Sequence, residues 1–474
     1  MSRRSAPDQS GYLAQDTIAA LSSAVGGAIA VIRVSGPKAP SILDELAGEA
    51  LSAGLQARMA KRVRLRDEAG RTLDDAVVIL FRAPKSFTGE DSVEFHVHGG
   101  GFIASRTLEA VIERGARPAL PGEFSFRAVR NGKMAIGEAE AIADLIGASN
   151  GAAADLALEK MSGSQSRLIV EMAEELRQLA TLGEIGIDFA DQDVDEVSLV
   201  NLKKRISSIS ARLIHLRDSF GRGSKVQDGV RVAFVGLPNA GKSSFFNVLL
   251  GEDRSIVSEI AGTTRDVVRE RLTLTGTLGS VTLRLEDTAG LRQAEDRIEQ
   301  MGIERTEAAA RDADLILWVV DPTGDAAEFK ALEEEWTRLG KPVSRTIGIA
   351  SKRDLASDAQ QKTLKSFLVG LGISQAWSIS SSDHSGVSEA ARAIADFSQK
   401  WVRRDPGEVL LTRLEHAEAV RSALEHLERA LQASEIDLFA SDLRQALFAL
   451  NPLIGDTLPD DILGRVFSQF CIGK

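Results

Sequence analysis

The first part of the chain alternates between short apolar runs and segments with helical spacing. The runs are rich in β-branched side chains and predict strands. They lie at residues 29–34, 63–65, 76–81 and 92–97. Helices are predicted after Ser35-Gly36-Pro37 and at residues 105–114. Because strands and helices alternate from about residue 11 to 120, we expect an α+β domain here.

From about Gly132 the pattern becomes helical. Two apolar stripes with helical spacing are typical of helix faces that pack into a core. The stripes consist of Ile169, Met172, Leu176 and Leu179, and of Ile206, Ile209, Leu213 and Leu216. Helical patterns return later, at residues 409–431, 438–450 and 461–470.

An α/β pattern interrupts these helices. Its predicted strands lie at residues 231–235, 281–285, 315–320 and 376–379, with a helix at 244–250. We expect Gly221-Arg222-Gly223-Ser224 to be a flexible boundary before this unit, which ends near residue 384. A compact unit with helices on both sides indicates a domain inserted into a helical domain.

The loop after the first of these strands is Gly236-Leu237-Pro238-Asn239-Ala240-Gly241-Lys242-Ser243, which fits the phosphate-binding P-loop pattern. Its glycines allow backbone N–H groups to surround phosphates at a helix N-terminus. Lys242 is expected to reach the β- and γ-phosphates, and the Ser243 hydroxyl is expected to bind Mg²⁺. Nucleotide contacts are predicted for Asn239, Ala240, Gly241, Lys242, Ser243 and Ser244.

Further motifs follow in the order of a Ras-like GTPase. Gly262-Thr263-Thr264 offers a hydroxyl for Mg²⁺, and Asp287-Thr288-Ala289-Gly290 offers a carboxylate and an N–H group near the γ-phosphate. In Ser351-Lys352-Arg353-Asp354, the Asp carboxylate would accept two hydrogen bonds from guanine, a pair that adenine lacks. Ser380-Ser381-Ser382 could hold the base from the other side. Ser351 departs from the usual motif, which begins with Asn.

Leu291 occupies the position at which Ras-like switches have a Gln that orients the attacking water. Leucine cannot form hydrogen bonds, so another group must orient the water. Glu295, Asp296 and Glu299 lie close by, and the residue pattern alone does not choose among them or exclude a solvated acidic segment.

The composition is that of a large globular protein. Of the 474 residues, 26% are charged and 43% are hydrophobic. The net charge of -11 excludes a generally basic nucleic-acid binder, so RNA contact would need a local patch or a partner. The single cysteine, Cys471, indicates a reducing compartment. With no apolar signal segment and no long apolar run, a cytoplasmic protein without a membrane span is expected.

Motifs outside the GTPase unit complete a resemblance that covers nearly the whole chain. They are Ile32-Arg33-Val34-Ser35-Gly36, Phe87-Thr88-Gly89-Glu90-Asp91, His98-Gly99-Gly100, Pro121-Gly122-Glu123-Phe124-Ser125 and Phe470-Cys471-Ile472-Gly473-Lys474. Together with the GTPase motifs, they make the chain resemble the MnmE (TrmE) family of tRNA modification GTPases. The final Cys-Ile-Gly-Lys is specific when it follows an inserted GTPase domain.

The resemblance implies the domain organisation. Residues 1–128 would form an N-terminal α+β domain that binds tetrahydrofolate and dimerises. Residues 129–224 and 385–474 would form a helical domain, interrupted at residues 225–384 by an inserted Ras-like P-loop GTPase domain. The protein would be a cytoplasmic homodimer.

The resemblance also implies an activity. Family members work with the flavoprotein MnmG, which carries FAD, and add an aminomethyl or carboxymethylaminomethyl group to carbon 5 of the wobble uridine in certain tRNAs. The implied cofactors are Mg²⁺, K⁺ and 5-formyl- or methylene-tetrahydrofolate, with GTP as substrate. The alternative is a GTP-switched RNA-binding or assembly factor without modification chemistry, which would be expected to carry a basic RNA-binding module.

Residue roles follow from the matched motifs. The resemblance assigns folate contacts to Arg33, Glu94, Lys133 and Lys474. It assigns Mg²⁺ to Ser243 and Thr264, and K⁺ to Asn239, Ser258, Ile260 and Thr263. Further GTP contacts are assigned to Glu259, Ala261 and Gly262, and the catalytic acid is Glu299. A cation beside the Asn239 side-chain carbonyl would supply the charge that an arginine finger brings to the transition state.

The end of the chain has two interpretations. Phe467, Phe470 and Ile472 are apolar where chains usually fray, and their burial would hold Cys471 and Lys474 in place. Cys471 would then be either a small buried apolar side chain or a thiol that acts on the uridine ring. The sequence favours the two equally.

Overall fold

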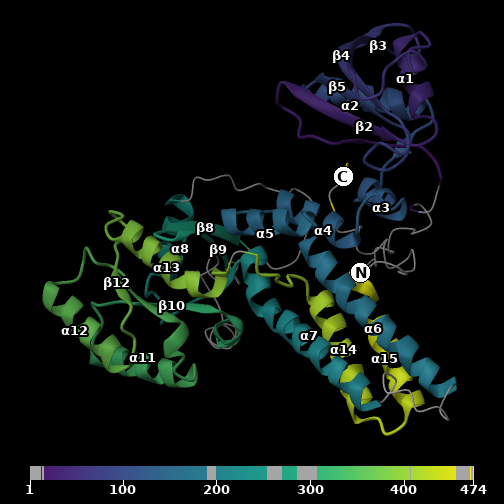
Figure 1. Ribbon diagram of the computed structural model, residues 1–474. Helices are drawn as coiled ribbons and strands as arrows, with labels where there is room; N and C mark the ends of the chain where they lie inside the picture. The colour runs from purple at the N-terminus through teal and green to yellow at the C-terminus, as the bar shows by residue number, and fades with distance from the viewer. Residues whose placement is uncertain are drawn as a thin grey trace, which may run out of the picture. The chain divides into compact units, whose positions relative to one another are not determined.

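The computed structural model describes Tyr12, Phe470 and Gly473, together with residues 15–188, 199–252, 270–285, 307–405 and 407–454. The chain divides into two compact units (Figure 1). Unit 1 contains Met1–Ala143, Lys160–Ile206 and Glu425–Lys474, and unit 2 contains Asp144–Glu159 and Ser207–Leu424.

Unit 1 begins with a six-stranded sheet whose strand order is β3-β4-β5-β2-β1-β6. The strands are β1 (Ile18–Leu21), β2 (Ile29–Ser35), β3 (Ala60–Arg66), β4 (Thr72–Phe81), β5 (Ser92–His98) and β6 (Arg117–Pro118). All neighbouring strands are antiparallel except β1 and β6. The four predicted strands are therefore confirmed, with β1 and β6 in addition.

Two helices, α1 (Ala39–Ala47) and α2 (Gly101–Glu113), share one buried apolar cluster with alternate residues of these strands. The alternation is visible in β3, where Val63 and Leu65 are buried while the residues between and beside them are exposed. Since side chains of a strand alternate between the two faces of a sheet, only one face of the sheet contributes to this core.

The remainder of unit 1 is helical. It contains α3 (Glu123–Arg130), most of α4 (Ile136–Ile146), all of α6 (Ser164–Asp188) and α15 (Ile436–Ile454). The predicted stripe from Ile169 to Leu179 is buried, and Gly183 of α6 lies close to Ala440 of α15. Phe470 is buried in a cluster with Tyr12, Phe126 and Ile136. The predicted burial of Phe470 is therefore confirmed, whereas Phe467 and Ile472 lie outside the described residues.

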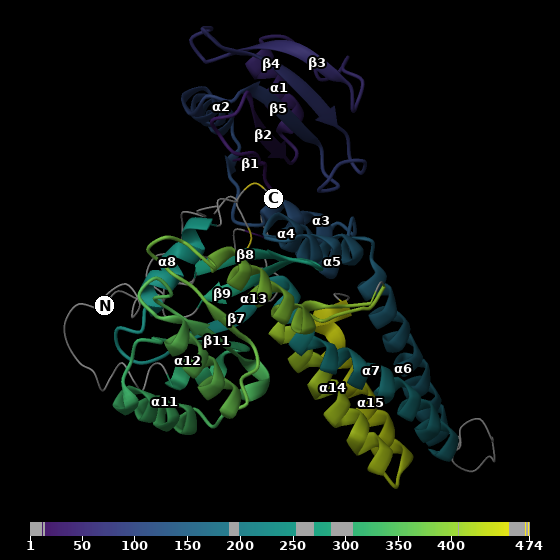
Figure 2. The same ribbon diagram turned by 90° about the vertical axis from the view of Figure 1, so that its left-hand side faces the viewer.

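Unit 2 contains a second six-stranded sheet, with strand order β12-β11-β10-β7-β9-β8. Figure 2 shows β7, β8, β9 and β11 of this sheet. Its strands are β7 (Val230–Val235), β8 (Glu270–Gly276), β9 (Gly279–Leu285), β10 (Leu315–Val320), β11 (Thr346–Ala350) and β12 (Ala376–Ser378). Neighbouring strands are parallel except β8 and β9.

Helices cover both faces of this sheet. One core includes residues of α8 (Lys242–Glu252) and α13 (Val387–Val402), and the other includes residues of α11 (Ala326–Arg338) and α12 (Asp358–Gly370). Every side chain of β10 is buried, as expected for a central strand of a parallel sheet. α13 packs on this sheet although it lies beyond residue 384. The domain boundary predicted at residue 384 stays a prediction.

The flexible boundary expected at residues 221–224 is wrong. Helix α7 (Leu199–Asp228) runs through this stretch without interruption. A Cβ atom on Gly223 would lie 2.1 Å from the Leu411 carbonyl oxygen, so the glycine permits close packing rather than flexibility. The Ser219 hydroxyl also accepts a hydrogen bond from the Leu411 N–H at 3.0 Å.

The helix predicted at residues 409–431 begins later than expected, as α14 (Leu414–Gln432). The helix predicted at residues 438–450 is confirmed as part of α15. Of the helix predicted at residues 461–470, all but Phe470 lies outside the described residues. The second apolar stripe, from Ile206 to Leu216, is buried as predicted.

Candidate nucleotide-binding site

The P-loop joins the end of β7 to the start of α8, as the motif predicts. Gly236 has a φ of 143°, and a Cβ atom there would lie 2.1 Å from the Val319 carbonyl oxygen of β10. Asn239 and Gly241 also have positive φ, at 60° and 93°. The loop therefore bends tightly against the neighbouring strand, and a side chain at residue 236 would prevent this.

The Lys242 ammonium group lies over its own loop. It donates hydrogen bonds to the carbonyl oxygens of Gly236 and Leu237, at 2.6 and 2.9 Å. Burial lowers the pKa of Lys242, because the surroundings solvate its charge less well than water does. A partly desolvated ammonium group beside backbone N–H groups interacts strongly with an anion.

Ser351 connects the fourth motif to the P-loop. Its hydroxyl is buried and lies 2.6 Å from the Ala240 carbonyl oxygen and 3.2 Å from that of Val320. Gly241 is adjacent, since a Cβ atom on it would lie 3.2 Å from Ser351 Cβ. The residue that departs from the usual motif thus still forms the connection between the two loops.

The carboxylate of Asp354 is held by the serine motif. The Ser382 hydroxyl donates to Asp354 Oδ2 at 2.9 Å, and the hydroxyls of Ser380 and Ser382 lie 2.9 Å apart. Hydrogen bonds from Ser380 and Ser382 lower the pKa of Asp354. The structure therefore brings together an ionised carboxylate and the segment predicted to lie on the other side of the base.

Two acidic residues near the P-loop were missed in the sequence. Asp321, at the end of β10, forms an ion pair of 2.5 Å with Lys352. Although burial raises it, hydrogen bonds from Lys352 and Thr323 leave the pKa of Asp321 below its ordinary value. An acidic residue directly after a buried parallel strand was a usable signal, because ligands bind at the carboxyl ends of such strands.

Glu335 is the second of these residues. It accepts a hydrogen bond of 2.7 Å from the indole N–H of Trp318, whose ring stacks on Trp336 at 4.9 Å. Burial raises the pKa of Glu335, while the Trp318 hydrogen bond and the charge of Lys242 oppose the shift. Glu335 follows Leu332 by three residues and is next to Trp336, and both of these residues are buried. This helical spacing indicated that Glu335 lies near the inner face of α11.

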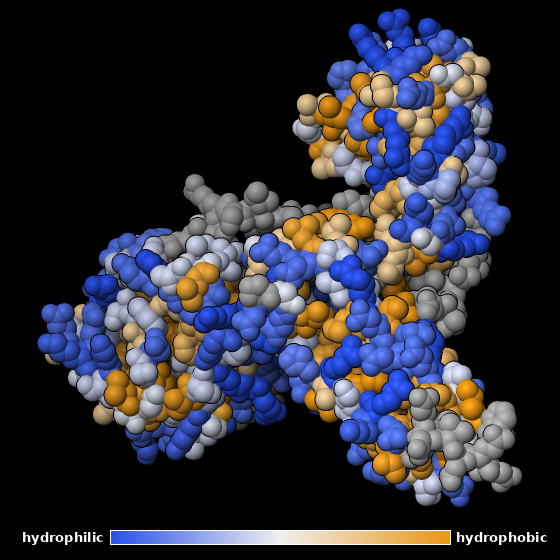
Figure 3. Space-filling model, viewed as in Figure 1, coloured by the Kyte–Doolittle hydropathy of each residue, from blue (hydrophilic) through white to orange (hydrophobic). Residues whose placement is uncertain are grey.

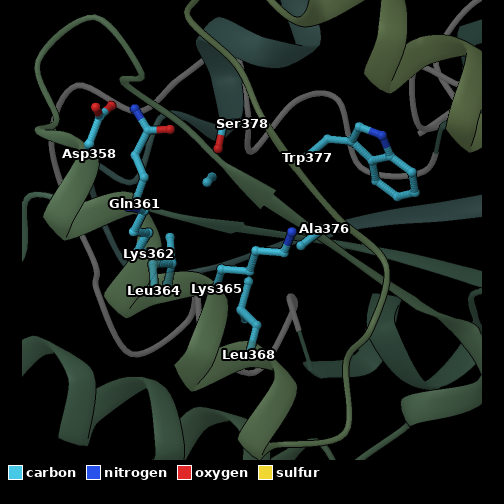
Figure 4. Close-up of a pocket in the computed structure, with 10 residues that line it drawn as sticks. Asp358, Gln361, Lys362, Leu364, Lys365, Leu368, Ala376, Trp377 and Ser378 are labelled. Atoms are coloured by element: carbon cyan, nitrogen blue, oxygen red, sulfur yellow. The ribbon is translucent and has the colours of Figure 1, made fainter.

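Described residues of unit 2 line two cavities that bear on the site. One, of about 130 Å³, is lined by P-loop residues Leu237 to Ala240 and by Asp321, Glu328 and Lys352. A larger one, of about 290 Å³, lies between α12 and β12 (Figure 4). The lining of the larger cavity includes none of the predicted nucleotide-binding residues. We therefore consider the smaller cavity to be part of the site and the larger one to be separate from it.

Several predicted residues of the nucleotide site lie outside the described part of the chain. They are Ser258, Glu259, Ile260, Ala261, Gly262, Thr263, Thr264, Asp287, Thr288, Ala289, Gly290 and Glu299, with the alternative acids Glu295 and Asp296 and with Leu291.

Unit 1 contains three of the four residues predicted to bind folate, and the fourth, Lys474, lies outside the described residues. Arg33 of β2 and Glu94 of β5 are direct register partners and form an ion pair of 2.9 Å. The Arg33 guanidinium lies over the rings of Phe87 and Phe124, at 5.3 and 5.8 Å from their centroids. A Cβ atom on Gly89 would lie 3.3 Å from the Lys133 side chain, which places Lys133 beside the 87–91 segment.

An ionic network built around the buried Arg127 and Glu123 supports this region. Arg127 forms ion pairs with Asp16, Glu90 and Glu123, at 2.8, 3.1 and 3.0 Å. Arg117 pairs with both Asp16 and Glu123. Glu90 and Glu123 belong to the motifs noted in the sequence, so these motifs are explained in part by a network that joins α3 to the sheet.

The end of the chain approaches the same sheet. Gly473 has a φ of 96°, and a Cβ atom on it would lie 2.4 Å from the Leu21 carbonyl oxygen at the end of β1. In the sheet, Ala20 of β1 pairs with Arg33 of β2. Cys471 and Lys474 lie outside the described residues, but their neighbours Phe470 and Gly473 are both packed against unit 1.

Among the described residues, no group of three or more His, Cys, Asp or Glu side chains is arranged to hold a metal ion. His96 and His98 instead lie near Glu94 and Asp74, at 3.4 and 2.7 Å. No described helix is long and apolar enough to cross a membrane.

Comparison with known proteins covers almost the entire chain. The family described as the MnmE helical domain matches residues 136–471, and the GTP-binding protein TrmE N-terminus matches residues 17–133. The tRNA modification GTPase MnmE of Cytophaga hutchinsonii is 37% identical over 97% of this chain and 98% of its own length. The protein of the same name from Azoarcus sp. is 39% identical, with the same coverage of both chains. The chain therefore belongs to the MnmE family, in which a GTPase domain is inserted into a helical domain behind a TrmE-type N-terminal domain.

Proposed function

We propose that this chain binds and hydrolyses GTP and, together with a flavoprotein of the MnmG type, modifies carbon 5 of the wobble uridine in certain tRNAs. The added group would be aminomethyl or carboxymethylaminomethyl. The observation that carries the GTP part is the joined base-and-phosphate frame, in which the Ser351 hydroxyl binds the P-loop carbonyl of Ala240. The tRNA part rests on relatives named as tRNA modification GTPases.

The frame suits guanine nucleotides. Asp354 is an acceptor-only carboxylate that Ser382 already orients, and guanine offers two adjacent donors to it. An adenine in the same position would leave the carboxylate unpaired. An unpaired polar group in a site discriminates against the wrong base more strongly than a lost apolar contact does. Lys242 would exchange its contacts with the Gly236 and Leu237 carbonyls for contacts with phosphate oxygens.

For hydrolysis, we assign the water-orienting role to Glu299 and the cation site to Asn239 with Ser258, Ile260 and Thr263. Asn239 supports the cation assignment, because its φ of 60° makes it the turning point of the P-loop and its amide offers a carbonyl ligand. The hydroxyls of Ser243 and Thr264 would hold Mg²⁺, which neutralises charge on the phosphates. K⁺ would supply positive charge near the transition state.

For the one-carbon chemistry, we assign tetrahydrofolate binding to Arg33, Glu94, Lys133 and Lys474. The donor set fits such a group, because the Arg33–Glu94 pair offers donors and an acceptor to a pterin edge beside the Phe87 ring. A bound folate derivative would supply the one-carbon unit. The approach of Gly473 to β1 supports a role for the neighbouring Cys471 and Lys474 at this site. A homodimer, in the cytoplasm, completes the proposal.

Nucleoside analysis tests the tRNA part. A strain that lacks the endogenous gene would be complemented with this chain or with the variant Asp354→Asn. Wild-type chain should restore the modified wobble uridine, and the variant should not. An unmodified wobble uridine despite full GTPase activity in the purified chain would refute modification and favour an assembly factor.

Salt substitution tests the catalytic part. GTP hydrolysis should be much faster in K⁺ than in Na⁺, and Asn239→Ala should remove this difference while GTP binding changes little. Equal turnover in the two salts would show that Asn239 has no such role.

A further inference from the structure

β3 is an edge strand of the sheet in unit 1, and it is strongly basic. Its exposed side chains include Lys61, Arg62, Arg64 and Arg66, and the exposed Arg58 precedes it. No acidic residue occurs in the sequence between Glu49 and Asp67. This concentration of positive charge contrasts with the net charge of -11 for the chain.

Few of these charges are compensated. Arg62 forms an ion pair with Asp75 on β4. Among the described residues, Arg58 and Arg66 donate only to neutral carbonyl oxygens, those of Lys85 and Gly70, at 2.9 and 3.2 Å. Within the described part of the chain, Lys61 and Arg64 form no ion pair, although Arg64 is the register partner of Asp75 and its charge acts on that carboxylate.

The basic row continues beyond the strand at both ends. At one end, the hydrogen bond from Arg58 to the Lys85 carbonyl brings the exposed Lys85 close. At the other end, Arg114, which follows α2 directly, donates to the Arg66 carbonyl oxygen at 3.3 Å. A strand of this length extends roughly 20 Å, so the charges are spread along the edge rather than gathered at one point. Arg62 and Arg64 lie on the face opposite that of Val63, whereas Lys61 lies on the same face as Val63. The surface around β3 and β4 is largely hydrophilic (Figure 3).

Charged residues on an edge strand also prevent unwanted pairing with other sheets. That role requires neither positive charge nor so many charges, and acidic residues, which outnumber basic ones in this chain, would serve equally well. A row of cations that outnumber their acidic neighbours instead complements an extended polyanion.

We propose that Arg58, Lys61, Arg64 and Arg66, here called the β3 basic edge, contact the phosphate backbone of the tRNA. This rests on the proposed function, which provides an RNA substrate. Contacts of this kind position an RNA without reading its sequence, and they weaken as the salt concentration rises. The basic RNA-binding element of this acidic chain is thus one strand rather than a separate module.

The test uses the full-length chain with Arg58→Gln, Lys61→Gln and Arg64→Gln combined. Arg62 is left unchanged because it pairs with Asp75. A matched control carries Lys330→Gln, Lys362→Gln and Lys365→Gln, which remove the same charge from exposed positions of α11 and α12. The Kd for an unmodified tRNA transcript would be measured over a range of KCl concentrations.

The edge variant should bind tRNA roughly tenfold or more weakly, and its slope of log Kd against log salt should fall by about 2. The control should match the wild type, and both should keep the wild-type melting temperature and GTP turnover. Equal losses in the two variants, or no loss in the edge variant, would overturn the proposal. Edge-dependent binding to phosphatidylserine vesicles but not to tRNA would also overturn it.

Failure of the proposed function can be distinguished from failure of the surface assignment. If complementation does not restore the modified uridine, tRNA modification is wrong, whatever the edge variant does. If the wild type restores it and the edge variant binds tRNA equally well, only the assignment of the surface is wrong.

Discussion

At the scale of single residues, Ser351 shows how a departure from a motif is accommodated. The shorter side chain still reaches a P-loop carbonyl, because Gly241 lets the loop approach Ser351 closely. The hydroxyl has a single proton to donate, so the connection between the two loops rests mainly on the 2.6 Å contact with Ala240.

Ser351→Ala should therefore weaken GTP binding. Loss of one buried hydrogen bond costs about 1 kcal/mol, which corresponds to roughly fivefold in affinity. Ser351→Asn should leave affinity unchanged or tighten it, because it introduces the usual side chain. Titration with a fluorescent GTP analogue measures both variants, and a large loss for Ser351→Asn would show that this site is too tightly packed for asparagine.

At the scale of elements, the segment at residues 144–159 belongs to unit 2 although it precedes α6. Asn150 donates to the Thr282 hydroxyl of β9 at 2.7 Å, and Ser149 lies 2.8 Å from the same oxygen. Glu159, in α5 (Gly151–Met161), forms a bidentate pair with Arg404 beyond α13, at 2.6 and 2.9 Å. Polar contacts thus fasten this segment to the β8–β9 hairpin and to the chain after α13.

The Glu159–Arg404 pair makes a prediction about acid stability. The hydrogen bond from Arg404 lowers the pKa of Glu159, so the folded state binds this proton less readily than the unfolded state. The pair's contribution is therefore present above the ordinary value of 4.5 and is lost as pH falls through the folded pKa. Since the pair is partly exposed, Glu159→Gln should cost no more than about 1 kcal/mol near neutral pH.

Urea unfolding of unit 2 at several pH values measures this difference. The gap between wild type and Glu159→Gln should close in acid. Glu174→Gln, which removes the exposed partner of Arg177 on α6, is a control in unit 1. A stability difference that persists at a pH at which Glu159 of the wild type is protonated would mean that packing, not charge, produces it.

At the scale of the whole molecule, the two ends of unit 1 in the sequence are close in the structure. Tyr12 and Phe470 share one apolar cluster, and Gly473 approaches the end of β1. In the proposed function, this arrangement would separate two activities in one chain: nucleotide chemistry in unit 2 and one-carbon chemistry in unit 1.

Gly473→Ala should therefore impair tRNA modification and leave GTP hydrolysis intact. The new Cβ would meet the Leu21 carbonyl oxygen at 2.4 Å and force the chain end away from β1. Gly407→Ala is a matched control, because Gly407 also has a positive φ, of 76°, but open space around it. Modified uridine would be measured in complemented cells, and GTP turnover in the purified chains. Equal effects of the two substitutions would indicate backbone strain alone.

The sequence by itself determined the local elements and the chemistry of the P-loop. Apolar alternation, helical stripes and glycine spacing are local properties, and they predicted the strands of the first domain, the core stripes of α6 and α7 and the turn at Gly236. The family motifs, read together, predicted the inserted GTPase domain that comparison with relatives confirms.

The tertiary structure decided what depends on residues far apart in the chain. Gly223 looked like a linker because its neighbour Leu411 lies in another part of the sequence. The Ser351–Ala240 contact, the Asp321–Lys352 pair and the network around Arg127 likewise join segments that no local pattern relates. The secondary-structure propensity of a residue depends on its own stretch of sequence, whereas the residue that it contacts is determined only when the chain has folded.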